Sequence, residues 1–386
     1  MYVVAIAVPV AEGGVGDGAL FQVVRSPGEF KHAHLPGAIN LPLFTDEERK
    51  VVGTTYKQVS RQDAIKIGLD YFGPKMRGMV EEVESILHSG FRISNDLEAN
   101  QPEIQNSKPQ IFLYCWRGGM RSGAVAWLLN LYGFNVTVLN GGYKAFRNWV
   151  LMTNEIAYPL QLIGGYTGSG KTALLKELEA AGEPVINLEE LASHKGSAFG
   201  NLGMPAQPSQ EMFENLLAVK ANSLFETMHG ASAGLSMETA AVSRKRIWIE
   251  DESQRIGQVN IPHAFWQNMR QSPVCFIDIP FEKRLENIVA EYGHLNRERM
   301  IAAIERISKR LGPLETKLAI QHLQEGNTKE SFCILLQYYD KRYQKALHNR
   351  ETLEALLTKI ACEKVTVQNA GLVSQAQQAA SYAGTN

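Results

Sequence analysis

Cysteine is scarce in this sequence, and the four that occur lie far apart: Cys115, Cys275, Cys333 and Cys362. No two of them form a C-x-x-C pair, which argues against both a structural zinc site and a disulfide framework. The spacing is typical of a protein from a reducing compartment. We therefore expect the chain to be cytoplasmic.

Long apolar runs and an excess of charge are also missing. No stretch approaches the roughly 20 apolar residues that a membrane helix needs, so no membrane partner is expected. The apolar residues 1–10 lack the basic start of a signal peptide, and they predict a first strand instead. Because the formal net charge is −1, any nucleic acid must be bound by local basic patches rather than by the charge of the whole chain.

The chain of 386 residues exceeds what one hydrophobic core usually supports. An apolar run at 111–114 precedes Cys115, a helical repeat follows it, and a second apolar run lies at 136–139. A similar pattern opens at 160–163, with later apolar runs at 184–188, 247–249 and 274–279. Both patterns predict parallel sheets, so the fold class is α/β.

These patterns set the expected domain organisation. We predict a first domain at 1–150 and a second at 151–370, whose mostly helical final part begins near residue 296. Residues 371–386 are rich in Gln, Ala and Ser, and this composition predicts a disordered tail.

The loop after the first predicted central strand has an unusual composition: Cys115, Trp116, Arg117, Gly118, Gly119, Met120, Arg121, Ser122. Backbone N–H groups between a strand and a helix can surround the sulfur and stabilise a thiolate. Arg117 and Arg121 add two positive charges. We therefore predict a nucleophilic Cys115 that attacks sulfur, selenium or phosphorus. A packing cysteine and the C-x5-R loop of cysteine phosphatases are the alternatives.

Residues 165–172 match G-x-x-x-x-G-K-[ST] between a predicted strand and a predicted helix, as a phosphate-binding loop requires. The expected phosphate ligands are Gly165, Gly168, Ser169, Gly170, Lys171 and Thr172. The Thr172 hydroxyl can face Mg²⁺, with Glu250 or Asp251 as the acidic partner at the end of another strand. An ordinary exposed strand end is the alternative for these acids. No base-specificity motif follows, so ATP and a non-nucleotide diphosphate both remain open.

The residues upstream of the cysteine loop carry a resemblance to a known family. Residues 25–30 read Arg-Ser-Pro-Gly-Glu-Phe, and residues 34–40 read His-Leu-Pro-Gly-Ala-Ile-Asn. Together with the cysteine loop they resemble the rhodanese family, in which a persulfide forms on the loop cysteine. Val23 stands where that family usually has an acidic residue. The loop is also one residue longer than in ordinary thiosulfate sulfurtransferases, which implies a larger donor.

A rhodanese domain ahead of a P-loop domain resembles the bacterial tRNA 2-selenouridine synthase family. The similar segments are residues 115–122, 139–147, 164–172, 194–200 and 250–253. The resemblance implies a transferase acting on the wobble 2-thiouridine in the anticodon of a tRNA. It further implies that geranyl diphosphate first alkylates the sulfur, and that selenophosphate then delivers selenium through Cys115. A diphosphate suits the phosphate loop, and selenophosphate suits the longer cysteine loop.

Several polar residues remain without a fixed role. His194, Lys195 and Ser197 lie in a Gly-containing loop and are expected to contact the diphosphate or the RNA, or to form a solvated turn. Arg299, Arg306 and Arg310 recur at helical spacing, and the stretch 338–343 mixes aromatic and basic groups. Both suit RNA contact and equally suit a solvated helix face.

Two other functions fit the same motifs. The first is a cysteine phosphatase domain fused to a P-loop kinase or NTPase. The second is a pair of regulatory modules in which the P-loop senses a nucleotide, although a binding module has no need of a reactive thiol. The sequence leaves the oligomeric state open.

Overall fold

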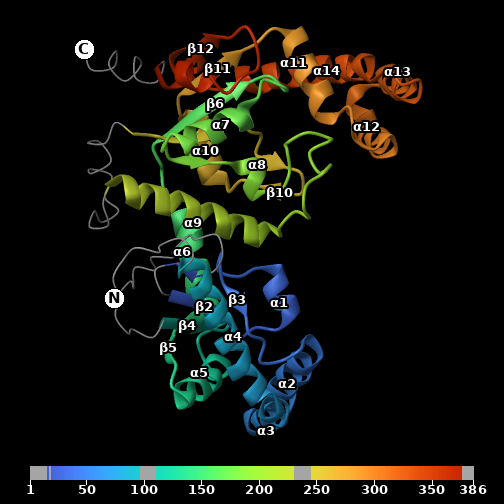
Figure 1. The fold of residues 1–386 in the computed structure, drawn as a ribbon. Coiled ribbons are helices and arrows are strands. Elements are labelled where there is room, and N and C mark those ends of the chain that lie inside the picture. The colour runs from blue at the N-terminus through green and yellow to red at the C-terminus, as the bar shows by residue number, and fades with distance from the viewer. Residues whose placement is uncertain (1–14, 17–18, 96–109, 230–244, 376–386) are drawn as a thin grey trace. The chain divides into compact units, whose positions relative to one another are not determined.

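The computed structural model describes residues 15–16, 19–95, 110–229 and 245–375. The strand predicted within residues 1–10 lies outside this part of the chain. The chain divides into two compact units, residues 1–152 and residues 153–386. Each unit is described by itself (Figure 1).

The sheet of the first unit has the order β1 (Val15–Gly16), β2 (Ala19–Val23), β4 (Gln110–Tyr114), β5 (Asn135–Val138), and β3 (Ile39–Asn40) pairs with β2. All pairings except that of β1 are parallel. The helix α5 (Met120–Tyr132) joins β4 to β5. This arrangement confirms the predicted succession of strand, loop, helix and strand around Cys115.

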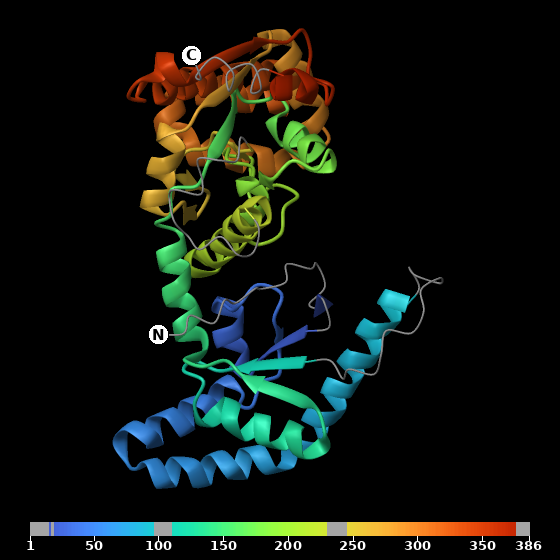
Figure 2. The same ribbon diagram turned by 90° about the vertical axis from the view of Figure 1, so that its left-hand side faces the viewer.

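Besides the short 3-10 helix Gly73–Lys75, the described part of the first unit contains six α-helices. They are α1 (Pro27–His32), α2 (Asp46–Gln58), α3 (Arg61–Phe72), α4 (Met76–Asn95), α5 and α6 (Gly142–Thr153). The helices α2 and α3 are separate because Ser60 caps the second one. Its side chain accepts the Asp63 N–H at 3.0 Å and so starts a new helix. Figure 2 shows α2 and α3 as an antiparallel pair. Apolar residues of α3, α4 and α5 pack on one face of the sheet.

The sheet of the second unit is entirely parallel, in the order β12 (Leu357–Ala361), β11 (Val274–Asp278), β6 (Leu160–Gly165), β8 (Ile247–Glu250), β7 (Val185–Ile186). The helices α9 (Gln210–His229) and α10 (His263–Gln271) pack on one face, and α7 (Lys171–Ala180) packs on the other. Because both faces are covered, the strands β6, β7, β8 and β11 are largely apolar, which made them visible in the sequence, whereas the edge strand β12 is not. The short elements α8 (Leu188–Leu191), β9 (Arg255–Ile256) and β10 (Val259–Asn260) lie in the connections.

The final part of the second unit is helical, as predicted. The helices α11 (Phe281–Tyr292), α12 (Arg297–Leu311), α13 (Pro313–Gln324) and α14 (Thr328–His348) lie together in the ribbon (Figure 1). Their buried side chains share a separate apolar cluster. The short α15 (Leu353–Leu356) leads into β12. These features confirm the α/β fold class with a helical C-terminal part.

The predicted disordered tail needs a correction at its start. Residues 369–375 are helical, and Val373 is fully buried in the core beside α7. This apolar contact orders the chain beyond residue 371, because burying a valine side chain stabilises the local fold. The remaining residues of that prediction, 376–386, lie outside the described part. Within the described residues, no helix is long and apolar enough to cross a membrane.

Candidate functional site

The Cys115 thiol lies at the end of β4, inside a loop that favours its ionised form. Its side chain is almost fully buried, and Sγ lies 3.3 Å from the Ser122 hydroxyl oxygen. Burial alone would raise the pKa of the thiol. Hydrogen bonds from the Ser122 hydroxyl and from three backbone N–H groups of the loop outweigh that effect, so the pKa lies below its ordinary value. The predicted nucleophilic character therefore has a structural basis.

The backbone of the cysteine loop is supported by the start of α6. The N–H groups of Tyr143 and Lys144 donate to the carbonyls of Cys115 and Trp116, both at 2.9 Å. Gly142 makes this approach possible, since a Cβ there would lie 2.4 Å from the Cys115 carbonyl oxygen. This contact explains the Gly-Gly-Tyr-Lys segment. It also provides a support for the loop although Val23 replaces the usual acidic residue.

The upstream motif docks against the same loop. Leu35 N–H donates to the Tyr114 hydroxyl at 2.9 Å, and the buried Arg25 donates to the Ala33 carbonyl at 2.8 Å. The Arg25 guanidinium lies 4.6 Å from the centre of the Tyr143 ring. Arg25 thus contacts the start of α6 through a cation–π contact with Tyr143, while its hydrogen bond to Ala33 lies within the segment at 25–40.

The two loop arginines differ in their surroundings. Arg121 donates to Glu29 at 2.9 Å, and Arg49 donates to the other oxygen of the same carboxylate at 2.9 Å. Burial opposes ionisation of Glu29, but the charges of these arginines lower its pKa below the usual value. Arg117 is exposed. Glu29 therefore offsets part of the positive charge predicted beside Cys115, and the sequence reading missed it.

Ser122→Ala should raise the pKa of Cys115, because the hydroxyl that stabilises the thiolate is removed. We expect the midpoint of the pH profile for Cys115 alkylation by iodoacetamide to move up toward about 8.5, the value of a free cysteine. Mass mapping of the labelled peptides measures it. Cys333, whose pKa is raised by burial, serves as the internal comparison. An unchanged midpoint would show that Ser122 does not tune the thiol.

Arg121→Ala and Glu29→Gln should change the charge at the loop in opposite directions. Removing Arg121 should slow alkylation of Cys115 by the anion iodoacetate relative to neutral iodoacetamide, by several-fold. Removing the charge of Glu29 should speed it by a similar factor. The ratio of the two rates isolates charge from thiol reactivity. If the ratio of the iodoacetate rate to the iodoacetamide rate were equal in both variants and in the unaltered chain, Arg121 would not contribute to anion binding beside Cys115.

The phosphate loop lies between β6 and α7 and adopts backbone conformations that favour glycine. Gly168 and Gly170 have φ values of 82° and 78°, and a Cβ at either position would clash with Ile288 or Val365. α7 begins at Lys171, so the N–H groups of its first turn point toward the loop. Lys171 donates to the Gly165 carbonyl at 3.0 Å. The predicted loop residues form the geometry that cradles phosphates.

Helices from the C-terminal part hold this loop in place. Tyr343 of α14 accepts the Gly165 N–H at 3.1 Å and donates to Asp251 at 2.8 Å. The buried Arg284 of α11 donates to the Thr167 carbonyl at 3.2 Å, and Asn287 donates to the Gly168 carbonyl at 3.2 Å. The sequence reading missed these positioning residues because they lie more than a hundred positions after the loop.

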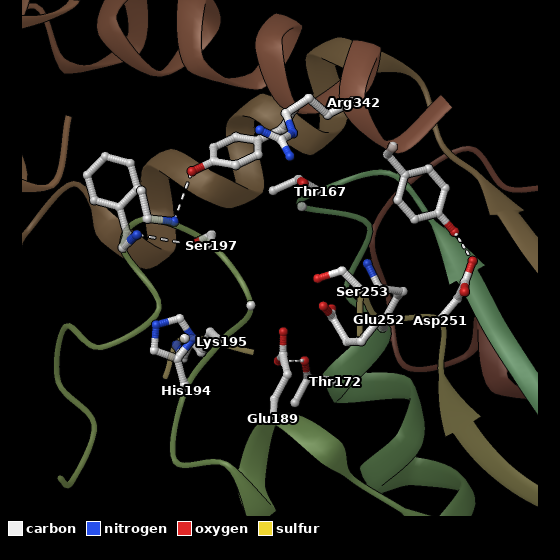
Figure 3. A pocket seen from close by; sticks show the side chains of 18 of the residues that line it. Thr167, Thr172, Glu189, His194, Lys195, Ser197, Asp251, Glu252, Ser253 and Arg342 are labelled. Carbon is white, nitrogen blue, oxygen red and sulfur yellow. Dashed lines mark hydrogen bonds between the residues drawn. The ribbon is translucent and has the colours of Figure 1, made fainter. Parts of the chain in front are cut away.

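The acidic residues are arranged differently from the prediction. Thr172 donates to Glu189 at 2.9 Å, while Glu250 is buried behind it and accepts the Glu189 N–H at 2.9 Å. Asp251 pairs with the buried Arg350 and with Tyr343. Figure 3 shows Glu189 and Glu252 pointing into the space beside Thr172. Glu189 and Glu252, rather than Glu250 and Asp251, are therefore the carboxyls nearest the reactive end of the loop.

Crowding of these acids shifts their ionisation. Burial raises the pKa of Glu250 to about 7 and that of Glu252 to about 8, and the charge of Glu189 adds to both shifts. Burial also raises the pKa of Glu189, against the attraction of Lys171. A cation bound beside them would favour their charged forms. Among the described residues, no cluster of three or more His, Cys, Asp or Glu side chains forms a metal site by itself.

The loop at 194–200 forms the opposite wall. His194 is buried between Gly200 and Gly257, and burial together with the charge of Arg306 lowers its pKa. Lys195 pairs with Glu291, and Ser197 accepts the Phe199 N–H at 3.2 Å. Figure 3 shows all three on the wall across the space from Thr172. The loop is therefore part of the site, although Lys195 and Ser197 also have structural partners.

A cavity of about 2260 Å³ connects these elements. Its lining includes the phosphate loop, His194, Lys195, Ser197, Asp251 and Glu252. Another part of the wall is apolar and comes from the helical extension, with the partly accessible Ile307 and the largely buried Ile288, Phe332, Leu335 and Leu336. The second unit thus offers phosphate ligands, carboxyls and an apolar surface in one cavity.

Comparisons with known proteins match both units of the chain. The profile of the tRNA 2-selenouridine synthase AAA domain matches residues 158–367, and that of the rhodanese-like domain matches residues 76–148. A tRNA 2-selenouridine synthase of Serratia proteamaculans is 34% identical over 359 residues, covering 85% of this chain and 86% of the relative. The chain belongs to the tRNA 2-selenouridine synthase family.

Other members of the tRNA 2-selenouridine synthase family are similarly related. The Sulfurovum protein is 32% identical over 83% of this chain and 86% of the relative. The Nitrosomonas europaea protein is 33% identical over 80% and 72%, respectively. A solved N-terminal domain from a Clostridium difficile 630 protein is 38% identical over 35% of this chain and 92% of that chain, but its TM-score of 0.29 carries no argument about the fold. Membership of the tRNA 2-selenouridine synthase family favours the predicted transferase over the phosphatase–kinase alternative.

Proposed function

We propose that this protein replaces sulfur by selenium in the wobble 2-thiouridine of tRNA. The observation that carries the proposal is the presence of two different reactive sites in one chain of this family. One is a cysteine loop with a stabilised thiolate, and the other is a phosphate loop that opens into a partly apolar cavity. Each site suits one of two successive steps.

The first step is alkylation of the sulfur by geranyl diphosphate in the P-loop domain. The thiocarbonyl sulfur attacks the first carbon of the geranyl group, the carbon–oxygen bond breaks, and diphosphate leaves. Lys171 and the N–H groups at the start of α7 would neutralise the leaving diphosphate. The apolar part of the wall, where Ile307 and Tyr339 keep part of their side chains accessible, would accommodate the geranyl chain.

The second step replaces the alkylated sulfur. A thiocarbonyl sulfur is a poor leaving group, whereas an S-alkyl substituent on the conjugated ring can leave as a thiol. The Cys115 thiolate would attack the phosphorus of selenophosphate, and the P–Se bond would break. The released selenide would attack C2 of the ring and expel geranyl thiol, and water would then hydrolyse the phosphocysteine to free phosphate. The loop N–H groups, Arg117 and Arg121 would bind the anionic donor.

The chain also has residues that fit Mg²⁺ as a cofactor. The Thr172 hydroxyl, Glu189 and Glu252 supply the oxygen ligands that this ion prefers, and their crowding leaves carboxyls that a cation would stabilise. A bound Mg²⁺ would neutralise charge on a diphosphate. Glu250, in contrast, supports the backbone of Glu189 from behind.

Mass analysis of tRNA nucleosides tests the proposal. Cells that lack this protein should contain 2-thiouridine derivatives and no 2-selenouridine derivatives, and returning the gene should restore the selenium product. Persistence of selenouridine in the cells that lack the protein, with no other source of the activity, would overturn the proposed function.

A further inference from the structure

Basic side chains line the cavity in a pattern that the phosphate loop does not explain. Away from the loop, the wall carries Arg255, Arg270, Arg306, Arg310 and Arg342. None of the five has a carboxylate within ion-pair distance among the residues that the structure describes. A diphosphate bound at Lys171 would be neutralised by positive charge at one end of the cavity only, so it does not account for these arginines.

The acids of the same wall are largely committed elsewhere. Glu291 pairs with Lys195, and Asp251 pairs with Arg350. Glu189 and Glu252 lie beside Thr172 at the phosphate-loop end. The rest of the wall carries one further acid, Glu351, against the five arginines, so it is locally positive although the whole chain has a formal net charge of −1. Such a local patch is what a neutral protein needs in order to bind a polyanion.

Two of the arginines are paired with aromatic side chains that also line the cavity. The Arg342 guanidinium lies 5.7 Å from the Tyr338 ring centre and donates to its hydroxyl at 2.9 Å. Arg270 lies 5.6 Å from the Trp266 ring centre. Arginine planes and aromatic rings are the groups on which unstacked RNA bases stack. Figure 3 shows Arg342 on the wall across from Thr172.

The arginines of helix α12 differ in whether they line the cavity. Arg306 and Arg310 line the cavity, whereas Arg299 on the same helix does not. Arg306 donates to the Ala198 carbonyl at 3.0 Å and so also supports the loop at 194–200. Arg310 is exposed, and its charge is free to act on a ligand. The structure therefore divides the three arginines that the sequence placed together.

We propose that this wall, formed by Arg270, Arg310, Arg342, Trp266 and Tyr338, binds the single-stranded loop of the RNA substrate. The arginines contact its phosphates, and the aromatic rings stack on its bases. The target base thereby reaches the diphosphate held at Lys171. This assignment rests on the proposed function, because that function supplies an RNA whose reacting base lies in a loop.

Salt-dependent binding of a synthetic anticodon stem–loop with 2-thiouridine at the wobble position tests the proposal. The double variant Arg310→Gln/Arg342→Gln should weaken binding roughly 15- to 25-fold at about 0.15 M salt, since each lost phosphate contact removes roughly four- to five-fold. The slope of log affinity against log salt should become shallower by about 0.7 to 0.9 for each contact. Arg299→Gln, which removes the same charge from the same helix, should change neither quantity.

Pyrophosphate binding, measured on the same variants, separates this proposal from the proposed function. Unchanged pyrophosphate affinity in the double variant shows that the phosphate loop is intact, and Arg342→Lys should restore most of the RNA affinity lost at that position. Equal weakening by Arg299→Gln, or unaltered RNA binding in the double variant, would overturn the assignment of this wall. Absence of stem–loop binding by the unaltered chain would instead count against the proposed function.

Discussion

Cys115→Ser is expected to abolish selenium incorporation while S-geranylated tRNA accumulates. The serine hydroxyl cannot form the thiolate that Ser122 and the loop N–H groups stabilise. The phosphate loop lies in a separate compact unit, so the alkylation step should continue. Nucleoside mass analysis after incubation with both co-substrates measures the two products.

Cys333→Ser is the matched control for this variant. Cys333 is half-buried in the helical extension, and burial raises the pKa of its thiol. The Cys333→Ser variant should therefore leave both the alkylation step and the selenium step unchanged. Loss of both steps in Cys115→Ser, with the control active, would contradict the division of labour between two sites.

Lys171→Ala is expected to remove geranylation of 2-thiouridine tRNA while the fold survives. Among the residues that the structure describes, the half-exposed Lys171 side chain donates to the Gly165 carbonyl, lies 5.9 Å from the Tyr343 ring centre and attracts the charge of Glu189. Its loss removes a charge-assisted hydrogen bond to phosphate, typically worth about 1.5–3 kcal/mol, or roughly 10- to 150-fold in affinity. Lys283→Ala, at an exposed ion pair with Glu286, is the control.

Calorimetry with geranyl diphosphate and with ATP decides what the loop binds. We expect geranyl diphosphate to bind more tightly, because the cavity provides an apolar wall beside the phosphate ligands. Lys171→Ala should weaken that binding, and circular dichroism should show a retained fold. Far tighter binding of ATP, together with ATP hydrolysis stimulated by tRNA, would contradict the geranyl diphosphate assignment and show that this domain hydrolyses a nucleotide.

Local motifs made much of the fold predictable. The segment around Cys115 and the segment at 165–172 each encode a strand, a glycine-containing loop and a helix within a short stretch, so neighbouring residues determine the geometry. Strands buried on both faces are also visible as apolar runs. The short β12 strand was missed, since its sequence Leu-Thr-Lys-Ile-Ala has no such run.

The acidic residues show where sequence reasoning fails. The three carboxylates at 250–252 look equivalent in sequence, but their roles depend on distant partners. Asp251 forms an ion pair with Arg350, 99 positions away, and Glu250 accepts a hydrogen bond from the backbone N–H of Glu189. Glu252 then faces the cavity with Glu189. Such assignments depend on tertiary packing, which no local pattern contains.

An order-of-addition experiment with the purified protein tests the two-step account most directly. The protein is first incubated with 2-thiouridine tRNA and geranyl diphosphate, and selenophosphate is added afterwards. The account predicts that S-geranyl-2-thiouridine forms in the first stage and is converted into 2-selenouridine, with release of geranyl thiol, in the second. Formation of 2-selenouridine from selenophosphate without any geranyl diphosphate would contradict it.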